Sequence, residues 1–292
     1  MHIDLVFTYV NGNDLPYTRK KYSYMEEQHK IYNPAVRHEG IDEIVWAVKS
    51  ALHFMPWLRT IYIVVDNQTL PADLPTLSPK LRVIQHTEII PSQYLPTYNS
   101  DVIESWLHAI PDISEVFLYN NDDIVHLAPI SLDEFVSAKD QRLKIKSKLN
   151  MTVLRAKTTE YSKRICLTVD LLRERHPYIQ CLNNHHTKVL RKSTLKHIEA
   201  EYAEWLETMR LCRFRGDNYI QYLMLAQSVD HFLNNNEISY DFREVAEVHV
   251  SDTKYQPNFF ERYKNRVLKF ACFNGMDSSY KEAFDEFMRL YI

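Results

Sequence analysis

The stretch FLYNNDDIV, residues 117–125, decides how the rest of the chain is interpreted. The apolar residues Val116 to Tyr119 run directly into two asparagines and two aspartates, Asn120 to Asp123, before the chain turns apolar again. A continuous apolar run of this length is typical of a strand buried on both faces of a parallel sheet. Adjacent carboxylates at its end indicate the mouth of a crevice, where a bound cation can offset their repulsion.

Two further apolar runs have the same character, Leu5 to Val10 and Ile61 to Val65, and each also ends in a polar cluster. A weaker fourth strand is predicted over Leu81 to Ile84, and helical spacing of apolar residues predicts helices over 42–54 and 101–109. Alternation of strands with helices favours an α/β fold with a mostly parallel sheet. Because ligands sit beyond the carboxyl ends of such strands, the polar clusters are expected at one rim.

The later part of the chain is predicted to be mainly helical. Residues 137–163 are rich in lysine and weakly periodic, which indicates an insertion or mobile lid, or alternatively a solvated charged hairpin. The sequence therefore predicts an α/β core at 1–136, an insertion or lid at 137–170 and a helical part at 171–292 that completes the same site. Helices are predicted over 193–211, 218–229 and 279–291.

Composition narrows the class of protein. The 292 residues are 45% hydrophobic and 25% charged, which is ordinary for a globular protein, and the net charge of −3 argues against a nucleic-acid partner. The four cysteines are too widely spaced for a CxxC pair and are expected to be reduced. Neither a signal peptide nor an apolar run long enough to cross a membrane is recognisable, so a cytoplasmic location is expected.

The order of several blocks resembles the Stealth family of sugar-1-phosphate transferases. The blocks are IDLVFTYVNGND at 3–14, RHEGIDEIVWAVKSALHFMPWLRTIYIVVDNQ at 37–68 and LPTYNSDVIESWLHAIPDISEVFLYNNDD at 95–123. NNHHTKVLRKS at 183–193, RLCRFRGDN at 210–218 and LKFACFNGMDSSYKEAF at 268–284 are similar to the third and fourth regions of that family, more loosely.

The resemblance implies a glycosyltransferase-A-like fold and transfer of a hexose-1-phosphate from a nucleotide diphosphate sugar, such as UDP-GlcNAc, to an acceptor hydroxyl, with release of a nucleoside monophosphate. The expected acceptor is a glycan or lipid-linked glycan of a bacterial capsule or other cell-surface polysaccharide. The expected cofactor is Mg²⁺ or Mn²⁺, and contact with the inner face of the membrane is compatible with such an acceptor. Two alternatives remain, a metal-dependent glycosyltransferase that releases a nucleoside diphosphate and an inactive sugar-nucleotide or glycan-binding module.

The carboxylates Asp122 and Asp123 are hard oxygen ligands of the kind that Mg²⁺ or Mn²⁺ binds, and an Asx-rich turn is the alternative. The resemblance places His185 as the general base that deprotonates the acceptor, because a neutral imidazole can accept a proton near neutral pH. His186 is the competing choice, since Thr187 stands where the family has proline.

The resemblance also assigns a phosphate contact to Arg215, whose planar guanidinium suits phosphate, with Arg213 as the competing choice. Glu104 is assigned to the site, and His108 lies four residues later in the same signature. The remaining residues that the resemblance places at the donor or acceptor are Asp4, Asn11, Gly12, Arg37, Asn121, His186 and Arg191.

The chain departs from the family pattern at two places. The family pattern has an aspartate–asparagine pair where this chain has Gly40 and Ile41, and an aspartate where it has Gly275. Asp42 and Asp277 are close enough in sequence to substitute. The enzyme interpretation requires that distant residues, near positions 4, 123, 185 and 215, converge on a single site.

Overall fold

The computed structural model of the chain describes residues 1–27, 41–147, 159–175, 185–249 and 267–292. A five-stranded sheet in the order β3-β2-β1-β4-β7 forms its centre. The strands are β1 (Asp4–Thr8), β2 (Ile61–Val65), β3 (Leu81–Gln85), β4 (Val116–Asn121) and β7 (Lys188–Arg191). The first four strands are parallel, and β7 runs antiparallel to β4 at one edge. The predicted α/β fold with a mostly parallel sheet is confirmed.

The apolar runs form strands because both of their faces are covered. All five residues of β2 are buried, and the residues of β1 alternate between two separate hydrophobic clusters. Leu5 and Phe7 belong to the cluster on one face, whereas Val6 belongs to the cluster on the other. Since each face contacts an apolar layer, the alternation of polar and apolar residues seen in half-exposed strands is absent from this stretch.

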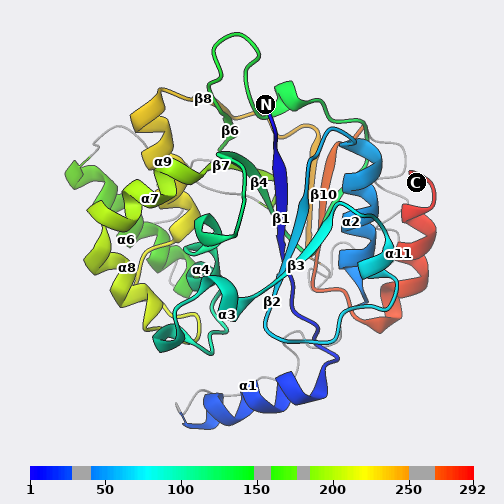
Figure 1. The fold of residues 1–292 in the computed structure, drawn as a ribbon, viewed down its shortest axis with the longest axis horizontal. Helices are drawn as coiled ribbons and strands as arrows, with labels where there is room; N and C mark the ends of the chain where they lie inside the picture. Colours follow the sequence, from blue (N-terminus) through cyan, green and yellow to red (C-terminus); the bar gives the residue numbers. More distant parts are fainter. Residues whose placement is uncertain (28–40, 148–158, 176–184, 250–266) are drawn as a thin grey trace.

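Helices cover the two faces of the sheet, as Figure 1 shows. One face is covered by α2 (Glu43–Phe54) and α11 (Lys281–Met288), which are joined by a hydrogen bond of 2.6 Å from Trp46 Nε1 to Asp285 Oδ1. The other face is covered by α4 (Ser100–Glu104), α6 (Glu160–Arg175), α7 (Lys192–Glu201), α8 (Ala203–Arg210) and α9 (Tyr222–Asn234). Helix α1 (Leu15–Glu27) lies beyond the carboxyl end of β1.

Two predicted helices are interrupted in the structure. The helix expected over 193–211 is divided at Tyr202, which has non-helical backbone angles (φ −123°, ψ 25°) and is 2% exposed. The segment expected as a helix over 101–109 is α4 followed by the short 3₁₀ helix η3 (Leu107–Ala109). In both places two short helices satisfy the apolar spacing that predicted a single one.

Two smaller sheets complete the fold. One has the order β5-β10-β9, formed by β5 (Ile124–His126), β10 (Phe270–Asn274) and β9 (Val245–His249). The other pairs β6 (Lys144–Lys146) with β8 (Glu237–Ser239). The short helices are α3 (His86–Ile89), η1 (Leu74–Thr76), η2 (Ser92–Tyr94), η4 (Leu132–Glu134) and η6 (Ser278–Tyr280). Because β10 lies antiparallel against β5, it brings the C-terminal part of the chain next to the end of β4.

The described parts of the predicted insertion are built into the fold. Strand β6 pairs with β8, and α6 buries Ile165, Val169 and Leu172 in the same cluster that contacts β4. Residues 148–158 lie outside the described residues. The segment at 137–170 therefore contributes core elements on both sides of that gap, which the lysine content of the sequence concealed. No helix among the described residues has both the length and the apolar character required to cross a bilayer.

Candidate active site

The predicted polar clusters lie at one edge of the sheet. Thr8, the last residue of β1, pairs with Asn121, so Asn11 and Gly12 follow β1 at the same edge where Asp122 and Asp123 follow β4. The side chain of Asn11 is engaged in the turn, where its Nδ2 donates to the Thr69 carbonyl at 2.7 Å. The carboxyl ends of the parallel strands thus form a polar rim, the usual position of a ligand site in an open α/β sheet.

Three carboxylates crowd this rim. Glu43, at the start of α2, is half-buried, and loss of water around it together with the charges of Asp123 and Asp42 raises its pKa to about 7. Asp122 is also half-buried, and the same two causes, with Asp123 and Glu43 as the neighbouring charges, raise its pKa well above the usual range. Such crowding is costly unless protons or a cation compensate the negative charge.

Asp123 lies at the centre of a mixed group of side chains. Its Oδ2 accepts a hydrogen bond from Cys272 Sγ at 3.3 Å, and one ligand atom each from Asp123, His185 and Cys272 lie within 4.8 Å of one another. The backbone supports this contact, because the Phe273 amide donates to the Asp123 carbonyl at 3.0 Å. These three residues form a group that could hold a metal ion.

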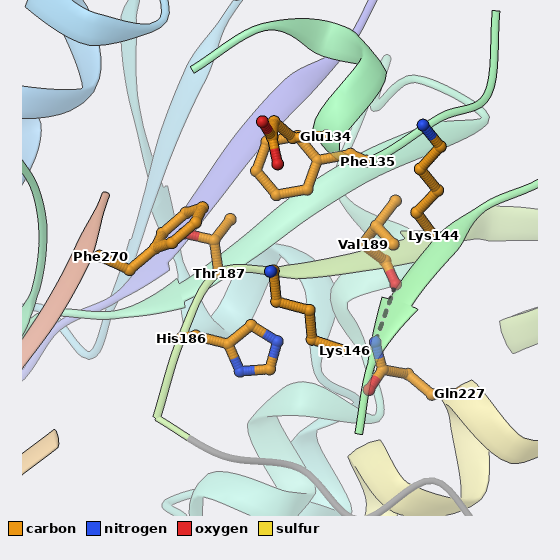
Figure 2. Close-up of a pocket in the computed structure, with 9 residues that line it drawn as sticks. All are labelled: Glu134, Phe135, Lys144, Lys146, His186, Thr187, Val189, Gln227 and Phe270. Carbon is orange, nitrogen blue, oxygen red and sulfur yellow. Dashed lines mark hydrogen bonds between the residues drawn. The ribbon is translucent and has the colours of Figure 1, made fainter. Parts of the chain in front are cut away.

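The structure separates the two neighbouring histidines. His185 is 40% exposed, lies beside Asp123, and its Nε2 is 3.7 Å from Oε1 of Glu247. His186 is 2% exposed and its ring packs edge-on against Phe242. Figure 2 shows His186 instead in a small pocket that it lines together with Glu134, Phe135, Lys144, Lys146, Thr187, Val189, Gln227 and Phe270. Of the two histidines, His185 is therefore the one whose side chain is accessible at the rim.

Glu104 is buried and connects the rim to the interior of the sheet. Its Oε1 accepts a hydrogen bond of 2.9 Å from the Tyr119 hydroxyl, which lies 3.0 Å from Thr8 Oγ1. Burial, with the charge of Asp101 adding to it, raises the pKa of Glu104 to about 8, while Lys188 opposes the shift. Glu104 and His108 do not share a helix, since α4 ends at Glu104 and His108 lies in η3, where the charged groups that act on it are Glu199, Arg210 and Lys196.

Lys188 was not identified from the sequence. It is 4% exposed, its Nζ donates to the His186 carbonyl at 3.2 Å, and it lies over the Tyr119 ring. Burial lowers its pKa, and the charges of Glu104, Cys272, Asp123 and Glu247 oppose this. A buried lysine on which the charges of Glu104 and Asp123 act supplies positive charge near these carboxylates. Its only signal in the sequence is a charged residue directly before the apolar pair at 189–190.

Arg215 lies on the surface beside α4. Its Nη2 donates to Ser100 Oγ at 2.6 Å, and its charge influences Asp101 and Glu104. Asp217, two residues after this arginine, pairs with Lys163 at 2.6 Å. Arg213, the competing choice, donates to the Pro96 carbonyl and stacks on Tyr24. Arg215 is thus the more exposed of the two, and it lies near the buried carboxylates.

Two predicted site residues lie at the opposite edge of the sheet. Asp4 begins β1, is 0% exposed, and its carboxylate binds Arg59 and the Ser114 amide. Arg191 ends the antiparallel strand β7 opposite Val116 and binds Asp230 at 3.1 Å. Both residues are separated from the rim by the length of a strand, so the predicted convergence fails for them. Both have structural ion pairs instead. Arg37 lies outside the described residues.

The acidic residues closest in sequence to Gly40 and Gly275, the two positions that differ from the family pattern, have different environments. Asp42 precedes α2 with a left-handed backbone (φ 60°) and its charge acts on Glu43 and Tyr9, so it belongs to the acidic rim. Asp277 instead caps η6 by accepting from the Ser279 amide at 2.9 Å. Glu43, Glu247 and Cys272 were not predicted as site residues, because neither the local residue pattern nor the family resemblance assigned them a role. Cys166 and Cys272 form no disulfide within the described residues, the Cys212 thiol donates to the Thr208 carbonyl at 3.3 Å, and Cys181 lies outside the described residues.

Comparison with known proteins supplies relatives over nearly the whole chain. A family model described as Stealth protein CR2, conserved region 2, matches residues 37–144. The capsular polysaccharide phosphotransferase fcs1 of Haemophilus influenzae is 32% identical over 99% of this chain and 83% of its own length. The capsular polysaccharide phosphotransferase LcbA of Aeromonas hydrophila is 37% identical over 54% of this chain and 45% of its own length. The chain thus spans less than half of that second relative.

Solved structures with a similar arrangement are glycosyltransferases. The galactosyltransferase LgtC superposes with a TM-score of 0.49 at 10% identity, covering 99% of this chain and 96% of the other. Mouse xyloside xylosyltransferase 1 gives a TM-score of 0.42 at 13% identity, covering 94% and 97%.

Proposed function

Since this chain belongs to the Stealth family of capsular polysaccharide phosphotransferases, we propose that it transfers a hexose-1-phosphate from a nucleotide diphosphate sugar to a glycan hydroxyl. The proposed donor is UDP-linked, with UDP-GlcNAc as the first to test, and the proposed acceptor is a glycan or lipid-linked glycan of a cell-surface polysaccharide. The observation that supports this proposal most is the position of His185 beside Asp123 at the carboxyl edge of the sheet.

The chemistry follows from the bond that is broken. The acceptor oxygen attacks the sugar-bearing phosphorus, the bond from that phosphorus to the bridging oxygen breaks, and the nucleoside monophosphate leaves with that oxygen. The bond between the anomeric carbon and its oxygen stays intact, so the anomeric configuration of the sugar is retained. Phosphoryl transfer of this kind depends on positioning and on charge stabilisation.

His185 is the proposed general base. It is accessible at the rim, and it can take the proton of the acceptor hydroxyl as the oxygen attacks. Glu247 lies 3.7 Å from its Nε2 and would stabilise the imidazolium that forms. The negative charge that develops on the phosphoryl oxygens would be met by Arg215, whose exposed guanidinium can bind phosphate with two hydrogen bonds.

The carboxylates Asp122 and Asp123 are the proposed ligands of Mg²⁺ or Mn²⁺. They fit a hard cation, because Asp123 Oδ1 is buried without a hydrogen-bond partner among the described residues and because burial, together with crowded negative charge, raises the pKa values of Asp122 and Glu43. When bound, such an ion would neutralise charge on the diphosphate oxygens. Gly12 and Asn121, which lie at the same edge, are the proposed contacts of the donor.

One assay tests this proposal. The purified chain is incubated with a panel of nucleotide sugars, a divalent cation and a glycan acceptor, and the nucleotide products are separated by chromatography. Release of a nucleoside monophosphate that requires acceptor is expected. Release of a nucleoside diphosphate would identify an ordinary glycosyltransferase, and binding without turnover would identify a sugar-nucleotide-binding module. A cytoplasmic location and contact with the membrane stay predictions.

A further inference from the structure

The geometry points to a second kind of metal chemistry at the rim: we propose that Asp123, His185 and Cys272 form a binding site for a borderline-soft divalent cation of the Zn²⁺ class. The three side chains come from three separate segments, namely the end of β4, the chain before β7 and strand β10. They offer one oxygen, one nitrogen and one sulfur atom.

The distances between the ligand atoms suit a small tetrahedral ion. Zinc binds sulfur at about 2.3 Å and nitrogen or oxygen at about 2.0 to 2.2 Å, so neighbouring ligand atoms of a tetrahedral site lie roughly 3.3 to 3.8 Å apart. The oxygen–sulfur pair of Asp123 and Cys272 already lies at 3.3 Å, and all three ligand atoms lie within 4.8 Å of one another. The remaining adjustment falls on His185, whose side chain is 40% exposed.

The surroundings also favour a bound cation. Cys272 is 0% exposed and sits on a β-strand, which fixes the sulfur opposite Asp123. The Oδ1 atom of Asp123 is buried and has no hydrogen-bond partner among the residues that the structure describes. Glu247 lies beside His185 and can hold its imidazole through a hydrogen bond, as carboxylates commonly do around metal-bound histidines. Three protein ligands leave a fourth position for water or a substrate oxygen.

The identity of the donor atoms separates this site from the proposed magnesium site. Mg²⁺ takes oxygen ligands, whereas thiolate and imidazole select metals such as Zn²⁺ and Co²⁺. When the metal–sulfur bond forms, the thiol proton passes to water. Because Asp123 and His185 are then both bound to the metal, Zn²⁺ should inhibit the transfer reaction. This expected inhibition rests on the proposed function, whereas metal binding itself does not.

Binding can be tested without any substrate, with Co²⁺ as the spectroscopic probe. The full chain is stripped with a chelator and titrated with Co²⁺ while its absorption spectrum is recorded. One equivalent of Co²⁺ should produce the near-ultraviolet charge-transfer band of a cobalt–thiolate bond together with the intense visible bands of tetrahedral cobalt. Addition of Zn²⁺ should remove both signals, and a large excess of Mg²⁺ should not.

Three variants and one matched control decide the assignment. Cys272→Ser should abolish the charge-transfer band, whereas Cys212→Ser, a half-buried thiol that donates to the Thr208 carbonyl, should retain it. Asp123→Asn and His185→Ala should each weaken Co²⁺ binding by about 10-fold or more. His185→Ala tests the site even if the buried cysteine variant does not fold, since its side chain is partly exposed.

The outcomes separate this inference from the proposed function. A wild-type spectrum without a thiolate band, or a band that persists in Cys272→Ser, would overturn the mixed-ligand site whatever the assay of transfer shows. A thiolate band in a protein that releases no nucleoside monophosphate would support the metal site and count against the transferase proposal alone.

Discussion

The Sγ atom of Cys272 lies 3.3 Å from Oδ2 of Asp123, although the two residues are 149 positions apart in the chain. This contact exists because β10 pairs antiparallel with β5, with Cys272 opposite Ile124, the residue that follows Asp123. The small sheet therefore attaches the C-terminal part of the chain to the carboxylates at the end of β4. The rim consists of residues from at least four separate segments of sequence.

Replacement of Asp123 by asparagine should abolish most of the transfer activity. The side chain keeps its size but loses the charge that a divalent cation requires, so the rate of nucleoside monophosphate release should fall by roughly 100-fold or more. The measurement is chromatography of the nucleotide product at saturating cation. Asp140→Asn, which alters an exposed aspartate paired with Arg142, is the matched control and should retain the wild-type rate. Equal rates for both variants would exclude Asp123 from the reaction.

Replacement of Asp4 by asparagine should affect stability and leave the reaction of the folded protein unchanged. The carboxylate is fully buried and binds Arg59 and the Ser114 amide, whereas Arg59 is 37% exposed and can be solvated when its partner is lost. The free energy of unfolding should therefore fall by about 2 kcal/mol. Urea denaturation measures this change. A variant with unchanged stability and lost activity would return Asp4 to the active site.

The buried carboxyl of Glu104 should make stability depend on pH. Its pKa is raised from 4.5 to about 8, so between these values the folded protein holds a proton that the unfolded chain has released. Unfolding becomes easier as pH rises through this window, with a slope of up to about 1.4 kcal/mol per pH unit. Glu104→Gln lacks this contribution.

The test compares the free energies of unfolding of wild type and Glu104→Gln at several pH values between about 5 and 9. This range covers most of the interval in which the folded and unfolded states differ in the protonation of Glu104. The stability of the variant relative to wild type should increase with pH and level off above about pH 8. Glu201→Gln, an exposed glutamate at the end of α7, should follow the wild-type curve. Parallel curves for wild type and Glu104→Gln would show that Glu104 titrates normally.

Replacement of Arg215 should affect the reaction, whereas replacement of Arg191 should affect the stability of the fold. Arg215→Ala should lower kcat/KM by roughly 100-fold through loss of a phosphate contact, with little change in unfolding, because this side chain is exposed. Arg191→Ala should instead lower stability, because it leaves the 4% exposed side chain of Asp230 without its arginine. Both quantities are measured for both variants. The reverse result would exchange the assigned roles.

The sequence predicted the sheet well because its strands are continuous apolar runs. The strand Ile61–Val65 was predicted with its observed bounds, and the α/β class is confirmed. The division of a predicted helix at Tyr202 was missed, since apolar spacing continues across the break and gives no sign of a change in direction. The described ends of the lysine-rich segment form β6 and α6, which the weak periodicity of the sequence did not indicate, and the interpretation of this segment as an insertion or lid stays a prediction.

The sequence identified the residues of the rim that a motif carries, namely the Asn-Asp-Asp run and His185, and missed others. The run Asn-Asp-Asp identified the edge of the sheet, whereas Cys272 and Lys188 reach it through strand pairing that no short motif encodes. Asp4 was predicted at the active site, whereas it lies at the edge of the sheet opposite the rim. A sequence motif shows that an acidic residue is present but does not show at which end of the sheet its side chain lies. The partner of Asp4, Arg59, lies 55 positions away.

The pairing of β10 with β5 also has a consequence for biosynthesis. A ribosome must synthesise the chain through Cys272 before the thiol can reach the carboxylate that was made 149 residues earlier. Nascent chains that have completed β1 to β4 therefore contain the acidic residues of the rim without this partner. Until β10 pairs with β5, the carboxylate of Asp123 can interact only with water, with dissolved ions or with the residues already synthesised.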